Sequence, residues 1–479
     1  MKPGGLLSSS LIYGAGAVAN RLAALLLLPV FTAYLTPADY GVVGLLATLG
    51  MFLTPVFSFG LGSSIGISYF ASAGSDAREK VIKSAFAIML LSAVCMAFLA
   101  AALKDTISSW MFSSTEFTPH VLVTILGVGF SLLVIPLQLR LQFEQRPVAF
   151  VNVSLIGLAG SLGTSYWMVA HREAGAIGLL AGAALGQGLT LAACGFCGFR
   201  FPRLKDLVSP IAKDLLVIGL PMIPSFFLLF FLQNAVRWPL EWQAGLHDVG
   251  LFTIGTNIGL AITVFCGGVV AAWLPHALSK AHEWEERRHE LAQSFTRYFA
   301  VAGYLVLLFF VGSQPVMKLF VADAFFPAWT VVGLAALAQF LISLYSMVLP
   351  PLYIAKKVRL VLISQAIAAL VTAMLMPWLV SFGMAGAALV VVVGALILVM
   401  ITSWVIHWAA TDVLPIPYNA GTLSGLALVI SAGAGLSFAL DIGDLPGFCI
   451  GAGAILSASA FVVIRITGLP VTLLSRIPR

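Results

Sequence analysis

The stretch from Leu360 to Thr411 contains no aspartate, glutamate, lysine or arginine, and it constrains the fold more than any other feature of the sequence. The hydrocarbon core of a bilayer is about 30 Å thick, so a helix needs roughly 20 apolar residues to cross it. The stretch is too long for one such helix, and Ser381-Phe382-Gly383 is the natural place for a break. We therefore expect two membrane-spanning helices here.

The rest of the chain has the same character. Of its 479 residues, 60% are hydrophobic and 9% are charged, whereas soluble domains carry about 25% charged residues. Backbone exposed to lipid must satisfy its own hydrogen bonds, which leaves helices or a closed barrel. Strands of membrane barrels alternate polar and apolar residues, and the apolar runs here are continuous. The composition therefore predicts an all-α polytopic membrane protein.

Charge-free intervals predict about fourteen transmembrane helices, each of roughly 20 residues or more. The predicted spans are 8–34, 42–68, 84–103, 120–139, 148–170, 175–197, 215–239, 249–275, 295–313, 328–349, 359–380, 384–407, 421–440 and 446–465. The longest predicted loops include Lys104–Pro119 on one side and Ser279–Gln293 on the other.

The basic residues predict the orientation. With the N-terminus in the cytoplasm, twenty of the 25 lysines and arginines fall on the cytoplasmic side, in short loops and at span ends. We therefore expect a multi-pass protein of the cell inner membrane with both termini in the cytoplasm. The net charge of +6 is explained by this bias, so it does not indicate a nucleic-acid partner.

A weak internal repeat predicts the domain organisation. Leu35–Gly41 follows the first span and Ala244–Gly250 follows the seventh, and both end in Asp-x-Gly. Transporters are often built from such repeats around a shared path. We expect a first lobe at residues 1–205, a second lobe at 206–410 and a C-terminal helix pair at 411–479.

Away from the cytoplasmic span ends, two arginines fall inside predicted spans: Arg21 in the first and Arg237 in the outer part of the seventh. A charge in the membrane costs about 2.5–3.5 kcal/mol on insertion scales and usually faces a wet cavity or a partner. Guanidinium groups suit phosphate, so two of them predict a pyrophosphate site. The predicted binding neighbours are Asn20 and Tyr13 for Arg21, and Gln233 and Asn234 for Arg237. Alternatively, Arg21 bonds backbone carbonyls in a packed interface and Arg237 snorkels to the outer headgroups.

Acidic residues fall in predicted loops or at span ends, which argues against a buried ion-coupling carboxylate. The nearest candidates for an external gate or coupling site are Asp39, Glu241 and Asp248. The histidines lack metal-ligand spacing, and we find neither a nucleotide-binding loop nor a nucleophile with a base, so we predict no metal, no cofactor and no enzyme activity. Gln365, inside a predicted span, is interpreted as an interhelical hydrogen-bonding residue.

Several short motifs, in order along this topology, carry a family resemblance. They are Leu35–Gly41, Phe59–Ile65, Gly219–Pro221 and Gly250–Phe252. With them the chain resembles the polysaccharide transporter family, which includes Wzx-type O-antigen and exopolysaccharide flippases, of the multidrug/oligosaccharidyl-lipid/polysaccharide superfamily. One departure is that family members often carry an acid beside the arginine of helix 7, where this chain has Gln233 and Asn234.

The resemblance implies two six-helix lobes around a central cationic cavity, with two helices appended. It also implies an oligosaccharide on undecaprenyl pyrophosphate as substrate, turned from the inner to the outer leaflet by alternating access. Polysaccharide polymerase and chain-length machinery are the expected partners. The alternatives are a lipid II flippase or a drug/cation antiporter of the same superfamily, and a membrane glycan polymerase or ligase. The last class usually needs a long external loop with catalytic residues, which this sequence lacks.

Overall fold

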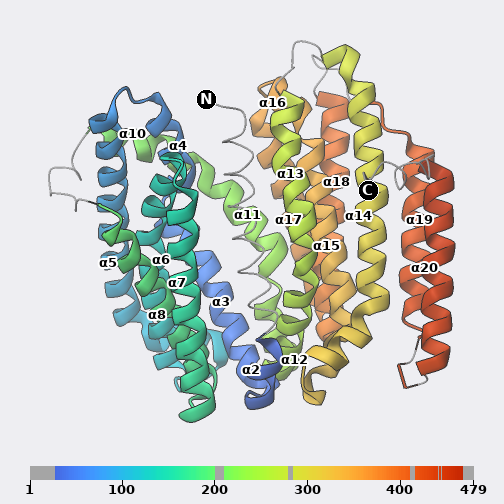
Figure 1. The fold of residues 1–479 in the computed structure, drawn as a ribbon, viewed down its shortest axis with the longest axis horizontal. Coiled ribbons are helices and arrows are strands. Elements are labelled where there is room, and N and C mark those ends of the chain that lie inside the picture. Colours follow the sequence, from blue (N-terminus) through green and yellow to red (C-terminus); the bar gives the residue numbers. More distant parts are fainter. Residues whose placement is uncertain are drawn as a thin grey trace. The chain divides into compact units, whose positions relative to one another are not determined.

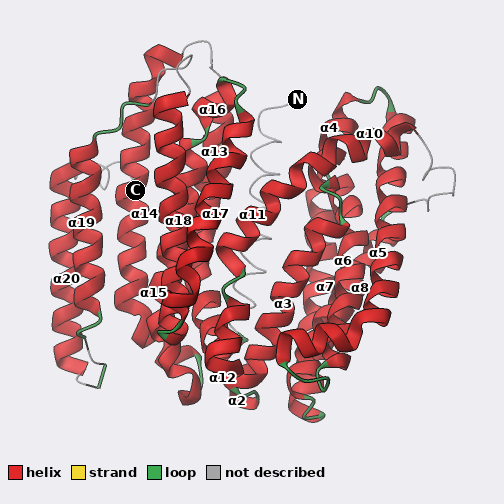
Figure 2. Ribbon diagram, turned by 180° about the vertical axis from the view of Figure 1, so that it is seen from behind, coloured by secondary structure: helices red, strands yellow, loops and turns green. Residues whose placement is uncertain are grey.

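The structure is a computed structural model that describes residues 27–199, 210–278, 284–409, 416–440, 442–443 and 445–467. Regular structure in these ranges is entirely helical (Figure 2). The chain divides into two compact units, Met1–Gly250 and Leu251–Arg479. The predicted all-α class is therefore confirmed.

The first unit contains a series of helices that stand side by side (Figure 1). In order they are α2 (Leu28–Tyr34), α3 (Pro37–Phe57), α4 (Leu61–Ala71), α5 (Ser75–Phe112), α6 (Thr118–Phe143), α7 (Pro147–Tyr166), η1 (Trp167–His171), α8 (Gly175–Phe196), α10 (Pro210–Gly219), η2 (Leu220–Met222), α11 (Ile223–Asn234) and α12 (Arg237–Gly259), the last of which continues past the unit boundary.

The second unit is also helical. In order its elements are η3 (Leu260–Ile262), α13 (Thr263–Leu278), α14 (Trp284–Phe320), η5 (Asp323–Ala328), α15 (Trp329–Val348), α16 (Pro350–Ile354), α17 (Val358–Val380), α18 (Gly383–Ala409), α19 (Ala420–Ser437) and α20 (Leu445–Thr467). Helices α19 and α20 pack side by side and also contact α14 (Figure 1).

Within the described ranges, 12 helical segments are long and apolar enough to cross a membrane. One of them, Pro210–Leu278, holds two of the predicted spans, and most of predicted span 8–34 falls among the undescribed residues. The break predicted at Ser381–Gly383 is confirmed, because α17 ends at Val380 and α18 begins at Gly383, whose φ is 69°. The chain is thus a polytopic membrane protein.

Three predicted spans are interrupted, and the eighth span is interrupted by η3 (Leu260–Ile262). The second is divided into α3 and α4 at Phe59 and Gly60, whose φ angles of 51° and 68° are left-handed. The seventh is divided into α10 and α11 by the 3₁₀ turn η2, which contains Pro221 and is followed by Pro224 in the first turn of α11. Proline lacks a backbone N–H and cannot continue the hydrogen-bond ladder of a preceding helix.

The glycines of the two Asp-x-Gly motifs lie where α3 packs against α12. A Cβ atom on Gly41 would collide with the carbonyl oxygen of Leu246, and one on Gly250 would collide with the carbonyl oxygen of Pro37. Only glycine permits this approach of two backbones. The contacts also explain why the chain divides at Gly250: α10, α11 and the start of α12 pack on α3 and α4. The predicted lobe boundaries at residues 205 and 410 were inferred from the internal repeat, and they stay a prediction.

The second unit is tied together by hydrogen bonds between helices. Trp273 Nε1 of α13 donates to the carbonyl oxygen of Met347 at 2.9 Å. Gln365 Nε2 of α17 donates to Tyr345 Oη of α15 at 2.8 Å, which confirms the interhelical interpretation of Gln365. Buried polar groups in membrane helices are normally satisfied in this way.

The long predicted loops are partly wrong. Helix α5 continues to Phe112, through much of Lys104–Pro119, and α14 begins at Trp284, inside Ser279–Gln293. The 38 residues of α5 correspond to about 57 Å at a rise of 1.5 Å per residue. This helix is longer than the hydrocarbon core is thick, so its ends extend into water. Charge-free intervals mark only the part of a helix within the membrane, and they therefore underestimated its length.

Candidate functional site

The connection between α11 and α12 places Arg237 differently from the sequence-based expectation. Helix α11 ends at Asn234, a two-residue turn follows at Ala235 and Val236, and Arg237 is the first residue of α12. Gln233, Asn234 and Arg237, which the sequence places within one predicted span, therefore lie on two helices. The turn nevertheless keeps two of these residues together, because Arg237 Nη1 donates to Asn234 Oδ1 at 3.2 Å.

Arg237 lies in the protein interior. It is 7% exposed, and the preceding turn residues Ala235 and Val236 are buried with it. An arginine that snorkels to the headgroups would keep its guanidinium exposed. Burial of a charge in the membrane requires polar partners or an anionic ligand, and the side chain of Asn234 is one such partner.

An aromatic cluster lies next to Arg237, around Trp238 and Trp242 of α12. The ring of Trp238 lies 6.0 Å from Phe230 of α11, 6.4 Å from Phe52 of α3 and 5.5 Å from Trp110 of α5, measured between centroids. Trp242 lies 5.7 Å from Trp110, and both of these tryptophans are more than half exposed. Exposed tryptophans are typical of a membrane interface. Through the contacts of Trp110 with Trp238 and Trp242, the cluster packs the start of α12 against the end of α5.

The other predicted binding residue on α11, Gln233, is half-buried, and its Nε2 donates to the carbonyl oxygen of Leu229 at 3.4 Å. Among the residues that the structure describes, Glu241 Oε2 is buried without a hydrogen-bond partner. Asp248 Oδ1 lies 3.4 Å from Nδ1 of the exposed His247, and the side chain of Asp248 is 30% exposed. The structure thus brings Arg237 and Asn234 together, while a gating or coupling role for the acids stays a prediction.

Asp39 has a local structural role. It is the third residue of α3, and its Oδ2 accepts from the backbone N–H of Thr36 at 3.0 Å and from Thr36 Oγ1 at 2.7 Å. The backbone N–H of Asp39 donates to Thr36 Oγ1 at 3.2 Å. This is a capping box, which satisfies donors at a helix N-terminus. A gating or coupling role for Asp39 stays a prediction.

Arg21, Asn20 and Tyr13 lie outside the described residues, so their part in a pyrophosphate site stays a prediction. Within the described ranges, histidine, cysteine, aspartate and glutamate side chains form no group that could hold a metal ion.

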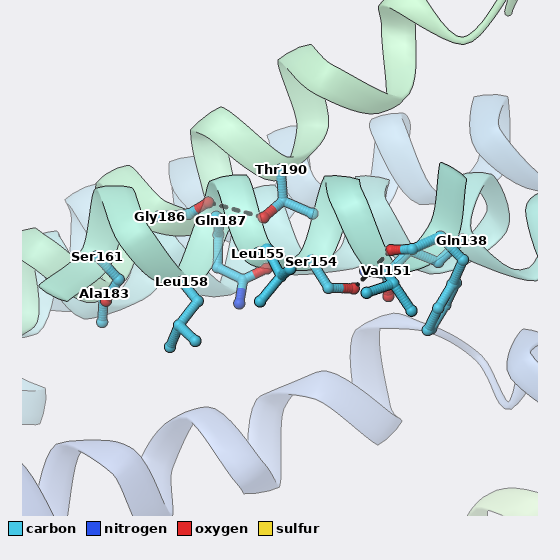
Figure 3. Close-up of a pocket in the computed structure, with 12 residues that line it drawn as sticks. Gln138, Val151, Ser154, Leu155, Leu158, Ser161, Ala183, Gly186, Gln187 and Thr190 are labelled. Carbon is cyan, nitrogen blue, oxygen red and sulfur yellow. Dashed lines mark hydrogen bonds between the residues drawn. The ribbon is translucent and has the colours of Figure 1, made fainter. Parts of the chain in front are cut away.

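A polar groove in the first unit was missed by the sequence analysis. It has a volume of about 440 Å³ and is lined by side chains of α6, α7 and α8 (Figure 3). The polar residues that line it are Gln138, Ser154, Ser161, Gln187 and Thr190. Ser154 and Ser161 of α7 are seven residues apart, and Gln187 and Thr190 of α8 are three apart, so each pair lies on one face of its helix. This spacing is the sequence signal that could have indicated the groove.

Residues 6–282 match a family model described as polysaccharide biosynthesis protein. No curated protein matches the sequence.

Solved structures resemble the fold. The lipid II flippase MurJ in an inward closed conformation has a TM-score of 0.71 at 12% identity, covering 95% of this chain and 99% of that chain. An inward-facing multidrug resistance MATE family transporter of the MOP superfamily has a TM-score of 0.69 at 16% identity, covering 82% of this chain and 95% of that chain. At sequence identities this low, the comparisons show a similarity of fold alone.

Proposed function

Because the chain belongs to the polysaccharide biosynthesis protein family, we propose that it is a flippase for lipid-linked oligosaccharide. It moves an oligosaccharide linked to undecaprenyl pyrophosphate from the cytoplasmic to the periplasmic leaflet of the inner membrane. The process is alternating access and includes no covalent step.

The burial of Arg237 carries this proposal. A guanidinium that is 7% exposed in a membrane protein is costly, and its planar fork suits a phosphate group. Asn234, which accepts a hydrogen bond from Arg237 Nη1, is neutral, so this contact leaves the positive charge in place. In this proposal Arg237 and Arg21 attract the pyrophosphate, while the polyprenyl tail stays in lipid.

Alternating access requires helices that can bend. The interruptions of the second and seventh predicted spans supply such points, at Gly60 and at Gly219–Met222. These two points are in contact, because a Cβ atom on Gly60 would collide with the carbonyl oxygen of Gly219. In the proposed mechanism, the first unit changes shape where these interruptions meet.

The orientation in the proposal follows the basic residues. The ends of α6 and α7 that carry Arg140 and Arg146, and the start of α17 with its lysines, face the cytoplasm. Polysaccharide polymerase and chain-length machinery would receive the substrate on the periplasmic side, which can be tested by co-purification from detergent extracts.

The function can be tested by deleting the gene and locating the lipid-linked oligosaccharide. A flippase predicts accumulation in the inner leaflet, measured by its resistance to a glycosidase added outside spheroplasts, and restoration of export by the wild-type gene. Accumulation of single repeat units in the outer leaflet would indicate a polymerase instead. Unchanged glycolipid with altered drug sensitivity would indicate an antiporter, and loss of peptidoglycan synthesis would indicate a lipid II flippase.

A further inference from the structure

The groove in the first unit is built on the close approach of α7 and α8. A Cβ atom on Gly186 would lie 2.6 Å from the Cβ of Ser161, and one on Gly157 would collide with the hydroxyl of Thr190. Helix α8 contacts α6 and α7 extensively, whereas α6 and α7 contact each other little. Helix α8 therefore lies between α6 and α7 and contributes Ala183, Gly186, Gln187 and Thr190 to the lining of the groove.

The hydroxyl groups of the groove are partly satisfied by their own helices. Ser154 Oγ donates to the carbonyl oxygen of Phe150 at 2.9 Å, and Thr190 Oγ1 donates to that of Gly186 at 2.8 Å. Their oxygen lone pairs can still accept hydrogen bonds from a ligand.

The side-chain amides of two glutamines have no such hydrogen bond to their own helices. Within the described part of the chain, the side chains of Gln138 and Gln187 make no hydrogen bond, and Gln187 is exposed. Gln187 lies about 18 Å from the start of α8 and about 14 Å from its end, at a rise of 1.5 Å per residue. An amide without partners near the middle of a bilayer is costly. Water or a polar ligand must therefore meet it.

The chemistry of the lining selects the kind of ligand. No charged side chain lines the groove, whereas its amides and hydroxyls both donate and accept hydrogen bonds. A phosphate would find no cation here. A neutral molecule rich in hydroxyl groups fits this pattern, and the ring of Phe150 adds an apolar surface. The volume of about 440 Å³ lies in the range of roughly 300–1,000 Å³ usual for small-ligand sites.

We infer that this groove binds the neutral sugar part of the lipid-linked substrate, separately from the pyrophosphate site at Arg237. The inference rests on the proposed function. Gln138 and Gln187 hold sugar hydroxyls from α6 and α8, and the groove gives the glycan a polar surface at a depth where lipid offers none.

The test measures binding of two probes to the purified full-length protein in detergent micelles by native mass spectrometry. One probe is lipid-linked oligosaccharide extracted from cells that lack this protein. The other is polyprenyl pyrophosphate without sugar. The variant Gln138→Met/Gln187→Met removes both amides at similar volume. Gln142→Met, which makes the same change at an exposed glutamine of α6 outside the groove, is the matched control.

We expect the double variant to bind the oligosaccharide probe about tenfold more weakly, the equivalent of one or two hydrogen bonds. Its affinity for the sugar-free probe should equal that of the wild type, which also shows that it is folded. Gln142→Met should bind both probes normally. Unchanged binding of the oligosaccharide probe, or equal loss of both probes, would overturn the groove as a sugar site. Failure of the wild type to bind either probe would overturn the proposed function as well.

Discussion

The backbone of Gly60, in the break between α3 and α4, packs directly against the backbone of Gly219, at the end of α10. A Cβ atom on either glycine would collide with a carbonyl oxygen of the other segment, that of Gly219 or of Phe59. Gly60 also has a φ of 68°, which disfavours any residue with a side chain. Two interrupted helices therefore meet at a point where neither can accept a methyl group.

The first prediction concerns this contact. Gly219→Ala should destabilise the protein by about 1–3 kcal/mol, because a methyl group is forced against backbone that cannot rotate away. Gly60→Ala should cost at least as much, since it adds backbone strain to the collision. Thermal unfolding in detergent measures both effects, and polysaccharide export should fall with them. Gly62→Ala is the matched control, because a Cβ atom there would meet nothing within 4 Å. Equal unfolding temperatures for Gly219→Ala and Gly62→Ala would contradict the prediction.

The second prediction concerns the charge of Arg237. Arg237→Ala should lower export about 10- to 100-fold, because a hydrogen bond to a charged group contributes about 1.5–3 kcal/mol. Arg237→Lys should retain part of the activity, since it keeps the charge but loses the planar fork. Export is measured as surface polysaccharide per unit of protein in the membrane.

The control for this pair is Arg172→Ala, because Arg172 is exposed and stacks on Trp167, with its Cζ 4.9 Å from the ring centroid. Its loss should leave export within about twofold of the wild type, as surface substitutions usually cost no more than about 0.5 kcal/mol. If Arg237→Ala and Arg237→Lys both export normally, Arg237 has no role in binding the substrate.

The third prediction uses the neutral partner of Arg237. Asn234→Asp should place a carboxylate against the guanidinium and cancel the charge offered to a pyrophosphate. Export should therefore fall at neutral pH, where the carboxylate is ionised, and recover as the pH falls through the pKa of the new aspartate. Asn234→Ser, which keeps a neutral acceptor, should show no such pH dependence. Transport in proteoliposomes at a series of pH values measures this, and a pH-independent Asn234→Asp variant would exclude the charge-cancelling contact.

The sequence predicted the spans well, because each depends on a long local average of hydrophobicity. It also located the break at Ser381–Gly383, where a glycine with a φ of 69° begins α18. It could not locate the turn before Arg237, because Ala235 and Val236 carry no turn signal. That turn is fixed by tertiary packing, in which Trp238 contacts aromatic rings of α3, α5 and α11.

The groove was missed for a related reason. Gln187 and Gln365 are both single glutamines in apolar helices, and their sequence contexts are alike. In the structure Gln365 donates to Tyr345, whereas Gln187 faces the groove beside Thr190. Whether such a glutamine bonds a neighbouring helix or lines a groove depends on which face of its helix packs against a neighbour. A single sequence does not show which face that is.

The fourth prediction separates the two roles of Asp39. If Asp39 acts as a helix cap, Asp39→Asn should keep normal export, because an amide oxygen can still accept from Thr36. Thr36→Ala, which removes the hydroxyl of the capping box, should lower stability by about 1 kcal/mol. Thermal unfolding and export are measured for both variants. A coupling carboxylate would give the reverse pattern: Asp39→Asn would abolish export at unchanged stability, while Thr36→Ala would export normally. We expect the first pattern, because one oxygen of Asp39, Oδ2, accepts both bonds from Thr36, and the amide oxygen of asparagine can take its place.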